Sequence, residues 1–194
     1  MSHHIYHTRG IILESQNRGE SNRFYKIFTE ELGLVWASAQ SVREGRSKLR
    51  YVLQDNAIIF VDLVRGKEVW RITSASEEQS LNILGGPEQK KLFIQACSFM
   101  SRLLQGEGRE EDLFIDILGF ASFLTREVVP HTLYKAVETL TTLRALFMLG
   151  YIDGLDYEHF LAPGEYSQDL ISKFNSVQAS VAPLISGAVN SSHL

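Results

Sequence analysis

The densest cluster of charge in this chain is the stretch SVREGRSKLR, residues 41–50. It contains one acid, Glu44, and four cations: Arg43, Arg46, Lys48 and Arg50. Arginine and lysine both pair with phosphate oxygens, so a glycine-containing loop of this kind could bind the backbone of a nucleic acid. A solvated surface loop without a ligand is the competing interpretation. The residue types alone leave both open.

Aromatic side chains near this loop suggest a second kind of contact, because proteins that bind single-stranded nucleic acids stack bases on aromatic rings. The candidates in the first half of the chain are Tyr25, Trp36, Tyr51 and Trp70. Core packing is the competing interpretation for each of them. Alternation in LVWASAQ places Val35, Ala37 and Ala39 on one face, which turns Trp36 outward. Trp70 shares strand parity with Ile72, so Trp36 and Tyr51 are the predicted stacking residues.

Further cations of the first half extend this interpretation. They lie at Arg9, Arg23, Lys26, Lys67 and Arg71. Alternation alone does not decide which of them share a face with the basic loop. The predicted nucleic-acid-binding set comprises Arg23, Lys26, Trp36, Arg43, Arg46, Lys48, Arg50, Tyr51 and Arg71.

Catalytic and metal-binding constellations are sparse in comparison. Cys97 could pair with His131 or His159 as nucleophile and base, but it lies among apolar residues of a helical pattern, where cysteine packs as a small hydrophobe. The acids at 110–112 suit a helix start better than a magnesium site. The histidines at positions 3, 4 and 7 could bind a stray metal, but they sit at a chain end and we expect them to lack an acid or cysteine partner. We therefore predict no catalytic residues, no cofactor and no metal.

Charge is distributed unevenly along the 194 residues, although the chain as a whole carries −4. Residues 1–76 hold eleven Lys/Arg and eight Asp/Glu, a net of +3, whereas residues 77–194 hold eight and fifteen, a net of −7. Surface fields are screened within about 8 Å at physiological salt, so an acidic total does not prevent the basic half from binding a polyanion. The single cysteine, the lack of a long apolar run and the N-terminus MSHHIYHTRG favour a cytoplasmic protein without membrane contact.

The elements that must position these residues are strands in the first half. Alternating or aromatic-rich segments predict five of them, at about residues 5–14, 22–30, 34–40, 56–64 and 67–75, with a tight hairpin at RGK. The basic loop falls between the third and the fourth. Five short strands with a variable loop at this place favour an OB-like closed barrel, a fold whose surface and loops bind oligonucleotides.

Helical periodicity replaces alternation after about Ser76. We expect helices at residues 87–106, 109–127 and 130–150, and a weaker helical region at 166–189 that is interrupted at Pro183. The expected fold class is therefore α+β, with a five-stranded OB barrel at residues 1–78 and an all-α domain at residues 79–194.

Several runs of the chain together resemble the N-terminal domain of the RecO family. These are TRGIIL, GESNRFYKIFTEELGLVWASAQSVREGRSKLRYVLQ and VDLVRGKEVWRITSAS. The matching features are the turn at residues 19–20 with Arg23 after it, residues 28–29 ahead of 32–34, Lys48-Leu49 in the basic loop, and residues 72–73 after the hairpin. In the second half, LFIDILGFASFL and LRALFMLGYIDGL resemble the helical domain of the family less strongly.

The resemblance has one departure. Many RecO proteins carry a four-cysteine zinc module after the helix that ends in Gly-Tyr, whereas the residues after Gly150-Tyr151 here contain no cysteine. The chain is also shorter than is usual for the family. It resembles a variant without the zinc module.

The resemblance implies a non-enzymatic DNA repair and recombination mediator. Such a protein binds single- and double-stranded DNA, anneals complementary strands, assists recombinase loading, and works with RecR and single-stranded DNA-binding protein. A different class of function stays open beside it, namely an OB scaffold that contacts proteins or RNA without annealing. An unrecognised hydrolase is a third alternative.

Overall fold

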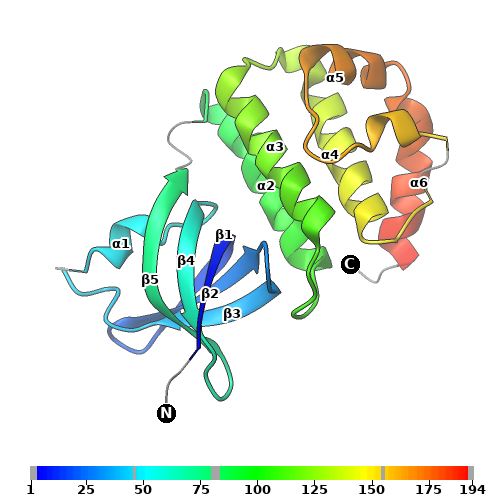
Figure 1. Cartoon of the computed structure of the whole chain (residues 1–194). Coiled ribbons are helices and arrows are strands. Elements are labelled where there is room, and N and C mark those ends of the chain that lie inside the picture. The colour runs from blue at the N-terminus through cyan, green and yellow to red at the C-terminus, as the bar shows by residue number, and fades with distance from the viewer. Residues whose placement is uncertain (1–3, 46, 80–83, 154–155, 192–194) are drawn as a thin grey trace. The chain divides into compact units, whose positions relative to one another are not determined.

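The computed structural model describes residues 4–45, 47–79, 84–153 and 156–191. The chain divides into two compact units (Figure 1). The first comprises Met1–Leu81 together with Leu104–Arg109, and the second comprises Asn82–Leu103 together with Glu110–Leu194. A segment distant in sequence thus belongs to the first unit. The predicted domain boundary after residue 78 stays a prediction.

The first unit is a closed five-stranded barrel in which the strands follow the order β1-β2-β3-β5-β4. Neighbouring strands are antiparallel except for β3 and β5, which pair in parallel. This is the OB fold, as the strand pattern predicts. The strands are β1 (Ile5–Arg18), β2 (Asn22–Thr29), β3 (Gly33–Ala39), β4 (Ile58–Val64) and β5 (Trp70–Gln79).

The barrel interior follows from alternation along each strand. Tyr25 and Ile27 of β2 pair with Ala37 and Val35 of the neighbouring strand β3 and point with them into the core. Trp70 joins them from β5 with 3% of its surface exposed. The assignment of Trp70 to the core is confirmed. The intervening side chains of β2 and β3 therefore point outward.

Several features of the barrel differ from the expected boundaries. Strand β5 spans residues 70–79, where 67–75 were expected. Strand β1 continues to Arg18 instead of ending near Glu14, because its second half pairs with β2 beyond a register shift at Ile12/Glu14. The basic loop also contains a short helix, α1 (Leu49–Val52), whose apolar residues pack against the barrel core. Alternation misses α1 because one helical turn is too short to show a period.

The segment 104–109 packs against the turn between β2 and β3. The Leu34 N–H donates to the carbonyl of Gly106 over 3.2 Å. Gly33 has φ +69°, and a Cβ at this position would lie 1.9 Å from the Gly108 carbonyl oxygen. Only glycine satisfies both the left-handed backbone and this close approach.

The second unit consists of helices, as periodicity predicts (Figure 1). One expectation is wrong: the break in the last helical region lies at residues 176–177, and Pro183 is inside a helix. Turn-like bonds from the N–H groups of Ser176 and Val177 to residues 173 and 174 end the earlier helix at this point. The helices are α2 (Pro87–Leu103), α3 (Glu111–Arg126), α4 (Tyr134–Met148), α5 (Gln168–Asn175) and α6 (Gln178–Ser191).

A buried charge network connects α3 and α4 to the stretch that follows α4. The Arg144 guanidinium is fully buried and donates to Asp116 Oδ1 over 2.8 Å and to the carbonyls of Phe160 and Glu165. Asp116 also accepts from the Gly164 N–H and the Tyr166 hydroxyl. Burial raises the pKa of Asp116, and the Arg144 charge opposes that rise.

Candidate nucleic-acid interface

The outer face of β1, β2 and β3 carries aromatic and cationic side chains together. Trp36 is 39% exposed because its neighbours Val35 and Ala37 point into the core. The outward orientation predicted for Trp36 is confirmed. Lys26 pairs with Trp36 across the β2–β3 ladder, and Phe24 pairs with Ser38 one step further along the same face.

A cation accompanies each of the two outward rings. The Arg18 guanidinium lies over Phe24 with 4.6 Å between Cζ and the ring centroid. Lys26 Nζ lies 5.9 Å from the Trp36 centroid. Proteins that bind single-stranded nucleic acids stack the bases on aromatic rings and neutralise the phosphates with nearby cations.

Two adjoining hollows deepen this face, with volumes of about 240 Å³ and 270 Å³. Phe24, Arg18 and Val69 line both of them, and Trp36 lines one. Arg18 belongs to the end of β1 and Val69 to the β4–β5 loop, so this strand end and this loop reach the same face. We call this combined surface the outer groove; its lining is Gln16, Asn17, Arg18, Asn22, Phe24, Trp36, Ser38, Gln40, Glu68 and Val69.

The first part of the basic loop is fixed against the turn between β1 and β2. Arg43 donates from Nη1 to the carbonyl of Gly19 over 3.0 Å, and its backbone N–H donates to the carbonyl of Ser21. The N–H of Ser41 donates to Asn22 Oδ1. These bonds bring the exposed Arg43 side chain to the turn that also carries Arg18. Arg46 lies outside the described residues.

The second part of the basic loop carries a separate pair. The Arg50 guanidinium lies over the Tyr51 ring at 5.0 Å, and Tyr51 is 66% exposed. Lys48 precedes α1 and is exposed. Arg71 lies on β5 and is exposed. Its register partner is Ser38 of the outer groove. Trp36 lies in the groove, and Lys26 and Arg71 lie beside it as the strand partners of Trp36 and Ser38. Arg50 and Tyr51 form a group of their own.

Arg23 has a different environment from the other predicted cations. It shares strand parity with the buried Tyr25 and is half-buried itself. Its Nε and the Tyr25 hydroxyl are buried and have no hydrogen-bond partner among the described residues. Burial raises the pKa of Tyr25, and the nearby Arg23 charge opposes this. Tyr25 is therefore a core residue.

Arg18 and Phe24 line the groove although neither is among the residues predicted from the sequence. The alternation that places Ile27 in the core also turns Phe24 outward, so this residue was detectable from sequence. Arg18 was not, because its position on the groove depends on the extension of β1 past its register shift.

Catalytic and metal sites find little support in the described parts of the chain. Cys97 is fully buried, and burial raises the pKa of its thiol, which disfavours the nucleophilic thiolate. His131 and His159 are both exposed. The expectation that His7 lacks an acid partner is wrong, because its Nδ1 lies 2.6 Å from Asp62 Oδ1. No group of three His, Cys, Asp or Glu side chains is placed to hold a metal ion in the described ranges, and His3 lies outside them.

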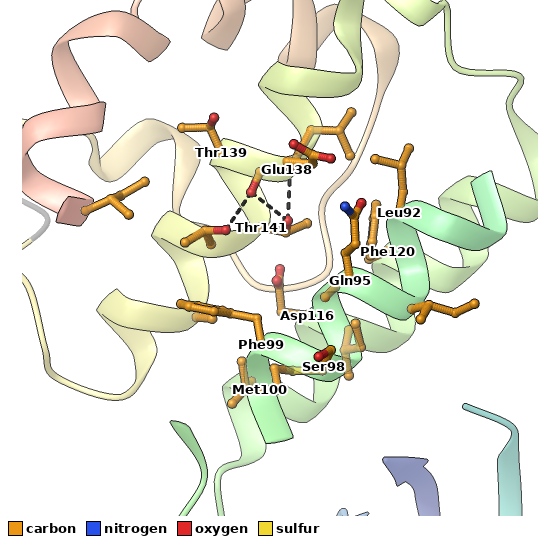
Figure 2. A pocket seen from close by; sticks show the side chains of 18 of the residues that line it. Leu92, Gln95, Ser98, Phe99, Met100, Asp116, Phe120, Glu138, Thr139 and Thr141 are labelled. Atoms are coloured by element: carbon orange, nitrogen blue, oxygen red, sulfur yellow. Dashed lines mark hydrogen bonds between the residues drawn. The ribbon is translucent and has the colours of Figure 1, made fainter. Parts of the chain in front are cut away.

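A hollow of the second unit has a volume of about 580 Å³ (Figure 2). Leu92, Phe99 and Met100 of α2 face it across from α4. The hydroxyls of Thr139 and Thr141 donate to carbonyls of their own helix. Polar and charged side chains, among them Gln95, Ser98 and Glu138, line the hollow together with the apolar ones. Among the described helices, none is both long and apolar enough to span a bilayer.

Comparison with known proteins gives a consistent result. Residues 1–79 match the family model described as recombination protein O N terminal. The chain is similar to the DNA repair protein RecO of Dehalococcoides mccartyi (strain CBDB1), with 29% identity over 70% of this chain and 54% of that protein. It is also similar to RecO of Klebsiella pneumoniae, with 28% identity over 91% of this chain and 70% of the relative. The chain spans about half the length of the first of these relatives.

Proposed function

We propose that this chain, whose residues 1–79 match the N-terminal family model of recombination protein O, is a DNA repair and recombination mediator of the RecO family that binds single- and double-stranded DNA and anneals complementary strands. The observation that carries the proposal is the outer groove, where Trp36 and Phe24 each lie beside a cation. Known OB folds use the corresponding strands and loops for oligonucleotides.

The mechanism needs no chemical step on the DNA. Arg and Lys side chains pair with phosphates without reading sequence, while the outward rings of Phe24 and Trp36 stack on unpaired bases. Specificity then comes from pairing between the two bound strands. On this view Arg43, Lys48 and Arg50 extend the phosphate path beyond the groove.

Protein partners belong to the same proposal. RecR and single-stranded DNA-binding protein are the expected partners, and recombinase loading is the expected outcome. We assign the protein contacts to residues 79–194, which carry the acidic excess and repel a polyanion. The proposed division of labour is a DNA-binding domain at residues 1–78 and a partner-binding domain after it, in a non-enzymatic protein of the cytoplasm.

Replacing Trp36 tests the groove directly. A stacked base contributes about 1–3 kcal/mol, so Trp36→Ala should weaken binding of a fluorescein-labelled oligothymidylate roughly 5- to 150-fold. The matched control is Phe60→Ala, which removes a ring that is 48% exposed on β4 outside the groove. Equal losses in both variants, or none in Trp36→Ala, would contradict the assignment.

Annealing separates the mediator from a mere scaffold. The full chain should accelerate pairing of complementary oligonucleotides, with and without single-stranded DNA-binding protein coating them. The Trp36→Ala variant should lose most of this acceleration. Binding of DNA without any acceleration would favour the alternative, an OB scaffold without annealing activity.

A further inference from the structure

Arg65 and Trp70 of the barrel hold an acidic side chain from a segment distant in sequence. Glu107 Oε2 forms an ion pair with Arg65 Nη1, and Glu107 Oε1 accepts a hydrogen bond of 2.9 Å from Trp70 Nε1. The Arg65 guanidinium also lies over the Trp70 ring, with 4.9 Å between Cζ and the centroid. The two oxygens of one carboxylate are therefore held by two different donors.

This donor pair has the chemistry of an anion subsite. A guanidinium and an indole N–H donate hydrogen bonds and never accept them. Two such donors directed at the same place favour an anionic oxygen there. Carboxylate and phosphate oxygens are interchangeable partners for arginine. Glu107 therefore occupies a place where a phosphate oxygen would find the same two donors.

The position of the subsite connects it to the outer groove. Arg65 opens the β4–β5 loop and Val69 closes it, and Val69 lines the groove beside Phe24 and Trp36. A strand stacked on these rings would have its backbone near this loop, the one that OB folds use together with the β2–β3 face.

The Glu107 carboxylate can be replaced by another anion at Arg65 and Trp70. The Arg65 and Glu107 side chains are 62% and 40% exposed, and exposed ion pairs contribute little net stability. The segment has other attachments to the barrel, including the bond from Leu34 to Gly106 and the Gly33–Gly108 approach. The carboxylate can thus leave its donors while the segment remains docked.

We propose that Arg65 and the Trp70 indole form a phosphate subsite for single-stranded nucleic acid, and that Glu107 fills it with its own carboxylate until a phosphate displaces it. The subsite rests on the proposed function in its choice of ligand. Glu107 then acts as an internal competitor that lowers affinity and makes the Arg65 contact dependent on a correctly placed strand.

Neutralising the competitor is the first test. Glu107→Gln keeps the shape of the side chain and removes its charge, so affinity for oligothymidylate should rise about three- to ten-fold. Because one further phosphate is neutralised, the slope of log K against log salt should steepen by about 0.7. Glu31→Gln is the matched control, since Glu31 lies 3.9 Å from Arg109 at the other end of the same segment. It should leave the slope unchanged.

The second test is a double-mutant cycle between Arg65 and Glu107. Arg65→Gln should change affinity little while Glu107 is present, because the phosphate contact that Arg65 gains on binding only replaces the ion pair that it loses. In the Glu107→Gln background the same change should cancel the gain. Equal effects of Arg65→Gln in both backgrounds would overturn the competitor role of Glu107.

The third arm does not depend on DNA. The chain has two tryptophans, so indole ¹⁵N–H spectra contain two signals that Trp36 and Trp70 variants assign. Inorganic phosphate added to Glu107→Gln should move the Trp70 signal and leave that of Trp36 in place. Absence of this shift overturns the subsite. A shift without any binding of DNA would instead retain the subsite and reject the proposed function, so the two failures are distinguishable.

Discussion

Cys97 is enclosed in α2 with none of its surface exposed, and burial raises the pKa of its thiol. Thiol reagents attack the thiolate, so the native protein should react with Ellman's reagent at neutral pH more than about 100-fold slower than the protein in denaturant. Absorbance of the released thionitrobenzoate measures both rates. Fast reaction of the native chain would mean that α2 opens readily or that Cys97 is accessible.

Arg144 is the residue whose loss should harm the second unit most. Arg144→Met leaves the buried Asp116 carboxylate without its counter-ion, and the carbonyl of Phe160 without its donor. Breaking one half of a buried ion pair typically costs about 3–5 kcal/mol in the free energy of unfolding. Urea denaturation followed by circular dichroism measures the loss.

A matched double variant tests that reason. Asp116→Asn combined with Arg144→Met removes both charges, so its loss of stability should be smaller than that of Arg144→Met alone. An equal or greater loss in the double variant would show that packing, and not the unpaired charge, determines the cost.

Individual residues of the groove were predictable only where alternation decides their orientation. Trp36 was placed correctly because three small residues define the opposite face of β3. Phe24 follows from the same rule applied to β2. Arg18 and Arg65 could not be found in this way, because their roles depend on pairing between segments far apart in sequence.

At the scale of elements, Gly33 determines how segment 104–109 is held. Gly33→Ala introduces a side chain at φ +69° and directly against the Gly108 carbonyl. We expect a loss of more than about 1 kcal/mol in the free energy of unfolding, together with faster amide exchange in residues 104–109. Hydrogen exchange with mass spectrometry measures the second effect.

Gly45→Ala is the control for this change. Gly45 lies in the basic loop, and a Cβ there would meet nothing within 4 Å. It should leave both stability and exchange in residues 104–109 unchanged. If Gly33→Ala behaved the same way, the close approach to Gly108 would not be a real constraint.

Element types were more predictable than element ends. The five strands and the main helices follow from hydrophobic periodicity, because buried residues recur every second position in a strand and every three to four positions in a helix. Pro183 shows the limit, because α6 continues through it and the chain turns at residues 176–177. The attachment of residues 104–109 to the barrel has no periodic signal, since it includes backbone contacts and the ion pairs of Glu107 and Arg109.

For the whole molecule, the net charge of −4 conceals two opposite halves. Screening within about 8 Å means that a phosphate near the barrel responds to nearby arginines and lysines and hardly to distant acids. Binding of DNA should therefore depend on where a charge lies, and a given change of net charge should have different effects in the two units.

Two variants with the same change of net charge test this expectation. Lys48 and Arg50 replaced by alanine remove two cations from the basic loop, whereas Lys90 and Lys91 replaced by alanine remove two from α2. The loop variant should weaken binding to all oligonucleotide sequences and flatten the salt slope by about 0.7 for each phosphate that the loop no longer neutralises on a single strand. The α2 variant should leave both quantities near their original values. Fluorescence anisotropy across a salt series measures them, and equal slopes in the two variants would mean that net charge, not the basic loop, governs the interaction.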